Sequence, residues 1–270
     1  MRSNYFFKGI LHLLIFIFLT VATQIGGFLY IVPFLLISNK VSKYKLKRTF
    51  FFITLYLTAS FLIVPKVAPL FGRVKIENNK NLEAHNFLTK LFNRNYVTPK
   101  MQKVLTNISL KIKKESPSLK VIYLDANFPF FNGFPLLPHL SHNDGKKIDI
   151  SFIYQTEKGI NTNAKPSNSG YGIFVAPKNN ENNQTNICKK KGFWQYDFTQ
   201  YFTLGSFHSD LKISEKATKN LIIQILKEDA ISKIFIEPHL KNRLNLRNSK
   251  IRFHGCGAVR HDDHIHFQIK

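Results

Sequence analysis

The sequence is poor in cysteine, tryptophan and acidic residues. Its 270 residues include two cysteines, one tryptophan and 16 Asp or Glu against 39 Lys or Arg, so the formal net charge is +23. The basic residues are spread along the chain as single lysines, and no recognised nucleic-acid-binding motif accompanies them. We therefore predict no nucleic-acid partner. The charge is compatible with contact to an anionic surface such as lipid headgroups or cell-wall polymer.

Charged residues are also missing from a long N-terminal segment. No charged residue lies between Lys8 and Lys40, and a second apolar run over about 50–71 carries a single lysine. The first run exceeds the roughly 20 residues that cross a bilayer, and a cleaved signal peptide would have a shorter core. We predict two transmembrane helices, at about 10–37 and 50–71, in a membrane anchor over residues 1–72. A buried hairpin in a soluble protein is the alternative, which the length and aromatic content disfavour.

The segment between the two apolar runs is dense in basic residues. It contains Lys40, Lys43, Lys45, Lys47 and Arg48. These outnumber Arg2 and Lys8 at the start of the chain, so the positive-inside rule predicts a cytoplasmic loop. Both termini would then lie outside. The predicted localisation is the cytoplasmic (inner) membrane, with the lipid bilayer as a partner of the N-terminal helices and the rest of the chain extracytoplasmic.

The remainder alternates short helical and strand patterns. Residues 73–117 look helical in pieces, broken at Pro99, and form a linker or N-terminal part of the outer domain. Residues 118–270 contain strand-like stretches such as "LKVIYLDANF" and "KKIDISFIYQ", and an amphipathic helix with Ser214 as its candidate N-cap. This mixed order predicts an α+β domain around a small, mostly antiparallel sheet.

Histidines and aspartates gather at the end of the chain, in "RHDDHIHFQIK". Side chains alternate between the two faces of an extended strand. His264 and His266 would therefore point the same way, while Ile265 and Phe267 pack behind them. One strand can present two imidazoles to one cavity in this manner. A pair of exposed strand histidines is the alternative.

A second cluster lies in "PHLSHNDGKKIDISF", which holds His139, His142 and Asp149. Asp149 is flanked by isoleucines in a predicted strand, where a carboxylate is costly to bury unless it is paired or binds a metal. Two imidazoles and one carboxylate drawn from the two clusters would make a His2Asp set. Three protein ligands with one open position are typical of a catalytic zinc site, in which the open position holds the reactive water.

The two clusters together resemble the penicillin-insensitive murein endopeptidases of the LAS metallopeptidase group. The shared pattern is H-x(6)-D followed much later by H-x-H, and this subset adds a histidine three residues before each motif. In this chain the pattern falls on His139, His142, Asp149, His261, His264 and His266. The resemblance covers roughly residues 120–270 and implies an LAS-type zinc peptidase domain over residues 118–270.

The resemblance also implies roles for these residues. The zinc ligands would be His142, Asp149 and His266, and the catalytic group would be His264, His261 and His139. His264 would stand beside the bound water as a general base or electrostatic partner. The implied function is a membrane-anchored zinc metallopeptidase that hydrolyses peptide bonds in peptidoglycan, with peptidoglycan peptides as substrate. The alternative is a non-catalytic zinc-containing protein that binds cell wall or scaffolds the membrane.

Several nearby side chains have an ordinary interpretation. Solvated turn carboxylates are expected at Asp144, Asp262 and Asp263, with hydrogen bonding to a histidine as the alternative. Surface or core placement is expected for His208, His239 and His254. The aromatic residues around Trp194 are expected mostly in the core, with a platform for a sugar or peptide stem as the alternative.

The two cysteines both fall in the segment that we place outside the membrane, where disulfides persist. A Cys188–Cys256 bond is therefore predicted, which would attach a long Asn-rich loop to the strand that leads into the site. Two buried free thiols are the alternative. Zinc ligation by cysteine is not expected, because the His/Asp set is complete without it.

Overall fold

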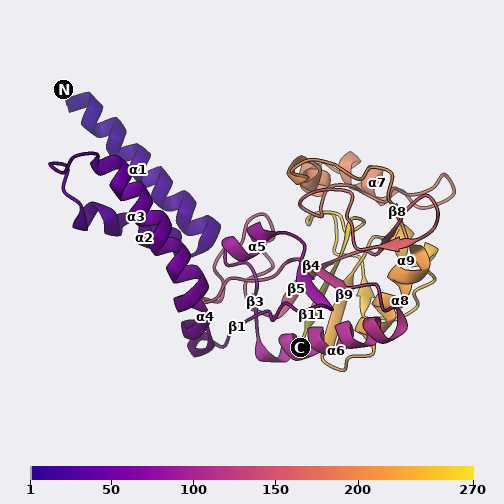
Figure 1. Ribbon diagram of the computed structural model, residues 1–270. Helices are drawn as coiled ribbons and strands as arrows, with labels where there is room; N and C mark the ends of the chain where they lie inside the picture. The colour runs from indigo at the N-terminus through magenta and orange to yellow at the C-terminus, as the bar shows by residue number, and fades with distance from the viewer. Residues whose placement is uncertain (1) are drawn as a thin grey trace.

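A bundle of apolar helices stands beside an α+β domain (Figure 1). The computed structural model describes residues 2–270, with side chains from residue 6 onward. The bundle consists of α1 (Arg2–Thr23), α2 (Gly26–Leu36) and α3 (Tyr44–Thr58), and α3 continues through the π-helical η1 (Ala59–Ile63), α4 (Val64–Val67) and the 3-10 turn η2 (Ala68–Phe71). Two helical stretches, Phe6–Thr23 and Tyr44–Phe71, are long and apolar enough to cross a membrane.

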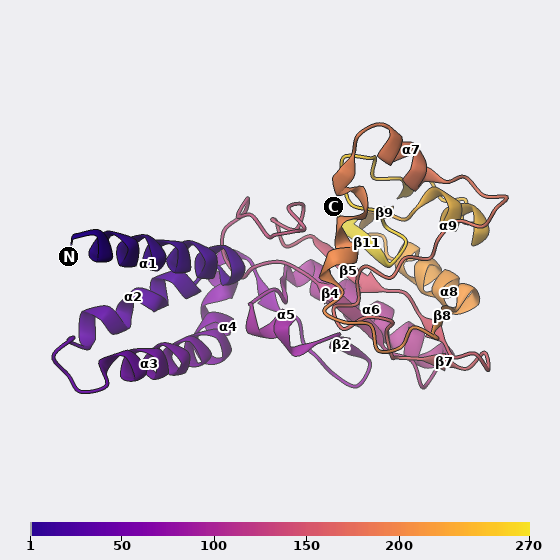
Figure 2. The same cartoon turned by 90° about the horizontal axis from the view of Figure 1, so that it is seen from above.

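The first apolar run differs from the single helix that we predicted over about 10–37. The chain reverses after α1 at Gln24, whose φ is +69°, and α2 packs back along α1 (Figure 2). Glycine allows the two helices to approach closely, because a Cβ added at Gly27 would lie 2.0 Å from Oγ1 of Thr20. Hydropathy alone did not reveal this reversal, since no charged residue separates the two halves of the run.

This hairpin changes the course of the chain through the bundle. The N-terminal end of α1 and the loop between α2 and α3 lie at the same end, far from the α+β domain (Figure 2). The 11 residues of α2 extend for about 16 Å at 1.5 Å per residue. That is about half the thickness of a bilayer's hydrocarbon core.

A six-stranded mixed sheet forms the centre of the domain, with the strand order β10-β9-β11-β5-β4-β2. The strands are β2 (Leu82–Ala84), β4 (Val121–Asp125), β5 (Lys147–Ser151), β9 (Ile231–Phe235), β10 (Ile251–Arg252) and β11 (His264–Ile269). The three inner pairs are antiparallel, and the two edge pairs, β10 with β9 and β2 with β4, are parallel. The predicted α+β class is confirmed.

Two helices, α6 (Pro99–Glu115) and α8 (Glu215–Leu226), pack on one face of this sheet (Figure 1). The sheet side of this core includes Ile148, Ile150, Ile265 and Phe267, all buried. Because strand side chains alternate, the residues between them project from the opposite face. The hydrophobic effect therefore fixes which face of β5 and β11 remains for polar side chains.

The remaining elements are short. They are β1 (Val74–Lys75), β3 (Tyr96–Val97), β6 (Tyr154–Gln155), β7 (Asn161–Thr162), β8 (Lys212–Ile213), α5 (Phe87–Leu91), α7 (Gln184–Lys190), the 3-10 segment η3 (Trp194–Phe202) and α9 (Pro238–Arg243). Polar contacts attach the bundle to the domain. The Tyr56 hydroxyl donates to the carbonyl of Leu91 over 2.6 Å, and the backbone N–H of Phe130 donates to Oε1 of Gln24 over 3.0 Å.

Candidate metal centre

The register of β5 and β11 brings two of the predicted ligands together. His266 pairs directly with Asp149 across the strands, on the face away from α6 and α8. His142 joins them from the loop that precedes β5. Their exposed fractions are 3%, 1% and 1%. Burial of such polar groups costs free energy unless they are paired or bind a metal.

Three donor atoms from these residues form a small triangle. Nε2 of His142 lies 3.2 Å from Oδ1 of Asp149 and 3.1 Å from Nδ1 of His266. The His266 nitrogen lies 2.8 Å from the same carboxylate oxygen. Donor atoms about 2.0–2.1 Å from a tetrahedral zinc ion are separated from one another by about 3.3 Å. The side chains present therefore fit a metal ion of this size.

The tautomer of His142 suits metal binding. Its Nδ1 lies 2.9 Å from the carbonyl oxygen of Ala126. A carbonyl can only accept a hydrogen bond, so Nδ1 carries the proton and neutral His142 turns the lone pair of Nε2 toward the triangle. The hydrogen bond from Nδ1 to Ala126 therefore both orients the His142 ring and fixes its tautomer.

His139 lies on the other side of the same carboxylate. Together with His142 and Asp149 it forms a buried group that could hold a metal ion, with ligand atoms within 4.8 Å of one another. Its Nδ1 lies 3.2 Å from Oδ2 of Asp149 and 2.9 Å from Oδ2 of Asp125. Asp125 in turn accepts two hydrogen bonds from Arg94. Nδ1 of His139 is therefore already engaged by Asp125, and the triangle with His266 is a second set of donor atoms that could hold the ion.

Tyr171 also contacts this carboxylate, and our sequence reasoning did not identify it. Its hydroxyl donates to Oδ2 of Asp149 over 2.8 Å, which leaves Oδ1 to the triangle. The backbone approach needs glycine on both sides: Gly170 and Gly172 have φ of +83° and +82°. A Cβ at Gly172 would lie 2.5 Å from the carbonyl oxygen of Thr199. The "SGYG" glycines were the only available signal.

His264 lies beside the triangle without belonging to it. Its Nε2 is 3.7 Å from Oδ1 of Asp149, and its Nδ1 is 2.5 Å from Oδ1 of Asp263. Burial acts to lower the pKa of His264, but the charges of Asp149 and Asp263 outweigh it and raise the pKa to about 9. A cation bound to Asp149 would oppose this rise, since it neutralises the same negative charge.

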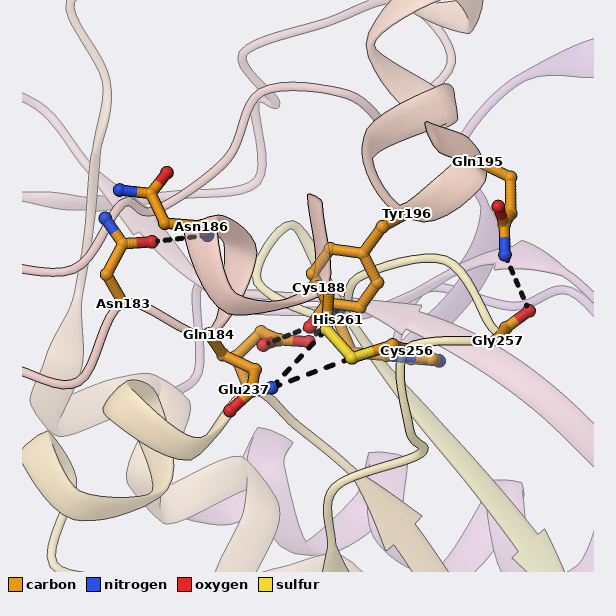
Figure 3. The surroundings of a disulfide bond; sticks show 10 residues. All are labelled: Asn183, Gln184, Asn186, Cys188, Gln195, Tyr196, Glu237, Cys256, Gly257 and His261. Carbon is orange, nitrogen blue, oxygen red and sulfur yellow. Dashed lines mark hydrogen bonds between the residues drawn. A yellow bond between two sulfur atoms is a disulfide. The ribbon is translucent and has the colours of Figure 1, made fainter. Parts of the chain in front are cut away.

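His261 lies next to His264, with the two ring centres 4.9 Å apart, and it lines the same cleft as His264 and His266. Its backbone N–H donates to Oε1 of Glu237 over 3.1 Å, and Oε2 of Glu237 accepts from the Tyr196 hydroxyl over 2.7 Å (Figure 3). Burial, together with the neighbouring histidines His264 and His266, holds the pKa of His261 well below its usual value. His261 is therefore neutral at ordinary pH.

The predicted disulfide between Cys188 and Cys256 is confirmed (Figure 3). It joins α7 to the segment that leads into His261. Because η3 follows α7 directly, the bond also attaches the aromatic η3 to the wall of the site. This is the attachment that we expected for the long loop.

The three turn carboxylates divide into two kinds. Asp144 accepts from Nζ of Lys147 over 2.6 Å and remains partly exposed, as expected. Asp262 and Asp263 are fully buried, so the expectation of solvated carboxylates is wrong there. Asp262 pairs with Arg260. Tertiary packing closes over these residues, which the local sequence did not reveal.

An open cleft of about 610 Å³ gives access to the cluster. Trp194 and Phe198 of η3 line one wall, and Leu137 and Leu140 line another. Trp194 is 74% exposed, so it is not the core residue that we expected. The aromatic side chains of η3 that lie outside the core form an apolar wall of the cleft.

No model of a known protein family matches this chain, and a comparison with curated proteins finds no significant match. The chemical interpretation therefore depends on the residues themselves. The described residues contain a His/His/Asp group that could hold a metal ion, a disulfide and two apolar helices. The roles of individual residues in catalysis remain predictions.

Proposed function

We propose that this chain is a membrane-anchored zinc metallopeptidase that hydrolyses peptide bonds in peptidoglycan. The triangle of His142 Nε2, Asp149 Oδ1 and His266 Nδ1 carries the proposal, because its dimensions suit tetrahedral zinc and its members are protein ligands that zinc prefers. These three residues line the cleft, and a zinc ion held by three protein ligands would have one position left for water or substrate. The motif spacing of the murein endopeptidases supports an LAS-type domain and this substrate class.

Hydrolysis adds water across the scissile amide: the hydroxyl joins the carbonyl carbon, the C–N bond breaks, and the amine leaves with a proton. Bound zinc would supply Lewis acidity, which polarises the carbonyl and lowers the pKa of a water. His264 would hold or move the proton at Nε2, and its Nδ1 contact with Asp263 supports this role by fixing the ring. His139 and His261 would orient substrate or their neighbours.

We further propose that the catalytic domain lies outside the cytoplasmic membrane. The basic loop between α2 and α3 and the N-terminal end of α1 lie together at the far end of the bundle (Figure 2). The positive-inside rule would place both on the cytoplasmic side. The domain follows the other end of the bundle and would face outward, where its disulfide would persist. The N-terminus would then be cytoplasmic, in contrast to our sequence-based expectation.

The test uses the full chain in detergent, loaded with zinc, and cross-linked muropeptides. Wild-type protein should cleave them, and a chelator should stop cleavage. The His264→Ala variant should keep its zinc but lose about 10²–10⁴-fold in rate, the usual effect of removing a positioned acid–base group. His208→Ala, which changes an exposed histidine, is the matched control and should behave as wild type.

Two outcomes would contradict the proposal. Near wild-type turnover by His264→Ala would show that His264 is not the acid–base group. His261 and Asp263 would then be the candidates. Zinc-loaded wild type without turnover on any muropeptide would favour the non-catalytic cell-wall-binding or membrane-scaffold function instead.

A further inference from the structure

A pocket of about 590 Å³ lies at the junction between the helical bundle and the domain. It shares no lining residue with the cleft at the candidate metal centre. Its bundle side is formed by η1, α4 and η2, and its domain side by β1, the residues just after β1, and α5 (Figure 1). We call it the junction pocket. Two lysines, Lys75 of β1 and Lys90 of α5, belong to its lining.

Two stacked aromatic rings hold these lysines at the wall of the junction pocket. The Phe87 ring of α5 stacks on the Phe61 ring of η1, with 5.9 Å between the ring centres. Nζ of Lys75 lies 5.5 Å from the centre of the Phe61 ring, and Nζ of Lys90 lies 5.8 Å from the centre of the Phe87 ring. Such cation–π contacts attract an ammonium group without using its hydrogen-bond donors on an acceptor atom. Both lysines can therefore donate to a ligand.

The charges in the junction pocket do not balance. Among the described residues, neither lysine forms an ion pair with a carboxylate. Glu77 is the only acidic residue of the lining, so one positive charge is in excess. Burial, together with the charge of Lys90, lowers the pKa of Lys75. An anion beside the two lysines would relieve their mutual repulsion.

A neutral donor accompanies the lysines. Asn78 belongs to the same lining, and its Oδ1 accepts from the Tyr123 hydroxyl over 3.0 Å. This contact leaves the two amide N–H groups of Asn78 as donors. Ammonium and amide N–H groups together suit the oxygens of a phosphate, which form strong hydrogen bonds because they carry charge.

The second apolar helix sets the depth of the junction pocket. No charged residue lies between Arg48 and Lys66, which are 18 residues apart. A helix of that length extends about 27 Å, close to the ~30 Å thickness of a bilayer's hydrocarbon core. If the bundle crosses a bilayer, Lys66 marks the edge of the hydrocarbon on the domain side. Pro65 and Pro69 of the pocket lining flank Lys66, so the pocket lies at the level of the lipid headgroups.

We propose that the junction pocket binds the phosphate headgroup of an anionic phospholipid from the surrounding bilayer. Lys75 and Lys90 would pair with the phosphate, and Asn78 would donate to it. The single negative charge of a phosphodiester matches the excess charge of the pocket, and the depth of the pocket favours a membrane lipid over a soluble phosphate. The inference rests on the proposed membrane anchoring and is independent of peptidase activity. A lipid bound there would hold the domain in one orientation at the membrane surface.

The experiment uses the full chain in phosphatidylcholine nanodiscs with increasing mole fractions of a phosphatidylglycerol that carries a diazirine at the headgroup end of one acyl chain. Illumination should label α5, within the peptide 84–115 that cleavage after Glu83 and Glu115 releases, and the labelling should saturate. The double variant Lys75→Gln/Lys90→Gln should need about a ten-fold higher mole fraction for half-maximal labelling, because lysines near an anionic membrane surface attract its lipids.

Two further variants make the test specific for the junction pocket. Glu77→Gln removes its only carboxylate and should reach half-maximal labelling at about a three-fold lower mole fraction. A variant that merely failed to fold would not bind more tightly. Lys114→Gln/Lys216→Gln removes the same charge from exposed positions of α6 and α8 outside the pocket, and it should label as wild type does.

Four outcomes would overturn the inference. The first is equal labelling of wild type and the Lys75→Gln/Lys90→Gln variant. The second is equal labelling by a phosphatidylcholine with the same diazirine, which would show no preference for an anionic headgroup. Displacement of the probe by millimolar glycerol 3-phosphate would identify a site for soluble phosphate instead. Protein that does not enter nanodiscs at all would contradict the membrane anchoring on which the inference rests, whereas absence of muropeptide hydrolysis would contradict the peptidase function alone.

Discussion

The two oxygens of Asp149 serve different partners. Oδ1 belongs to the triangle with His142 and His266, while Oδ2 accepts from the Tyr171 hydroxyl and lies near His139. Burial acts to raise the pKa of Asp149, but the charges of His142 and other nearby histidines lower it well below its usual value. The carboxylate is therefore ionised and held in one orientation before any metal arrives.

The first prediction concerns metal content. His142→Ala, Asp149→Ala and His266→Ala should each lose bound zinc, because each removes one of three proposed protein ligands. Elemental analysis of the purified proteins checks this, with His208→Ala as the control that retains metal. Full zinc occupancy in any of the three ligand variants would remove that residue from the proposed ligand set.

A second prediction concerns Tyr171. The Tyr171→Phe variant removes the hydrogen bond to Asp149 and keeps the ring, so zinc affinity should fall about 10–100-fold, as for other groups that orient a ligand. Competition with a chromophoric chelator measures this affinity. Tyr123→Phe is the matched control, because it removes a buried tyrosine hydroxyl that bonds Asn78 instead. Equal affinities in the two variants would show that Tyr171 does not orient the carboxylate.

At the scale of elements, the site depends on segments distant in sequence. β5 and β11 supply two proposed ligands through their antiparallel register, whereas α7 and η3 form an outer wall that few core contacts hold. The disulfide between Cys188 and Cys256 closes a separation of 68 residues across this wall. The bond therefore stabilises the part of the cleft that the sheet does not support.

The third prediction tests this attachment. The Cys188→Ser/Cys256→Ser variant should lose about 4 kcal/mol of unfolding free energy in the loop-entropy model. Chemical denaturation followed by the fluorescence of Trp194, the only tryptophan, measures the change from within η3. Ser109→Ala, which alters a buried polar residue of α6, is a control for a general loss of stability. An unchanged denaturation midpoint in the double cysteine variant would show that other contacts hold η3.

In the whole molecule, a small set of contacts joins the apolar bundle to the α+β domain. Tyr56, Phe61 and Gln24 reach the domain from the bundle, all at the end of the bundle nearest the sheet. If the bundle crosses a membrane, this junction sets the position of the metal cluster relative to that membrane.

The fourth prediction concerns that orientation. A periplasm-active reporter should be active after Lys270, and silent when fused before Met1 or inserted near Lys43. The reason is the hairpin, which puts the N-terminus and the basic loop at one end. Replacing the loop lysines by glutamine should weaken the preference of this loop for the cytoplasmic side. An active N-terminal reporter with a silent loop would instead support a single first span over about 10–37, and an active loop reporter would place the domain in the cytoplasm.

The sequence by itself determined the α+β class and the apolar helical segments, because hydrophobic run length and strand alternation depend on neighbouring residues. The disulfide followed from the presence of only two cysteines in a segment placed outside the membrane. The combination of His142 and Asp149 with His266 was expected from the resemblance to the murein endopeptidases. Asp149 between two isoleucines could only face away from the core, because the isoleucines had to enter it.

Only the tertiary structure decided the rest. The reversal at Gln24 depends on helix–helix packing around Gly27, which no hydropathy pattern contains. Asp263 is buried because Gly172 of a distant loop closes over it and donates a hydrogen bond. Tyr171 meets Asp149 across 22 residues of sequence. Such contacts between distant segments depend on how the whole chain packs, so the local sequence cannot specify them.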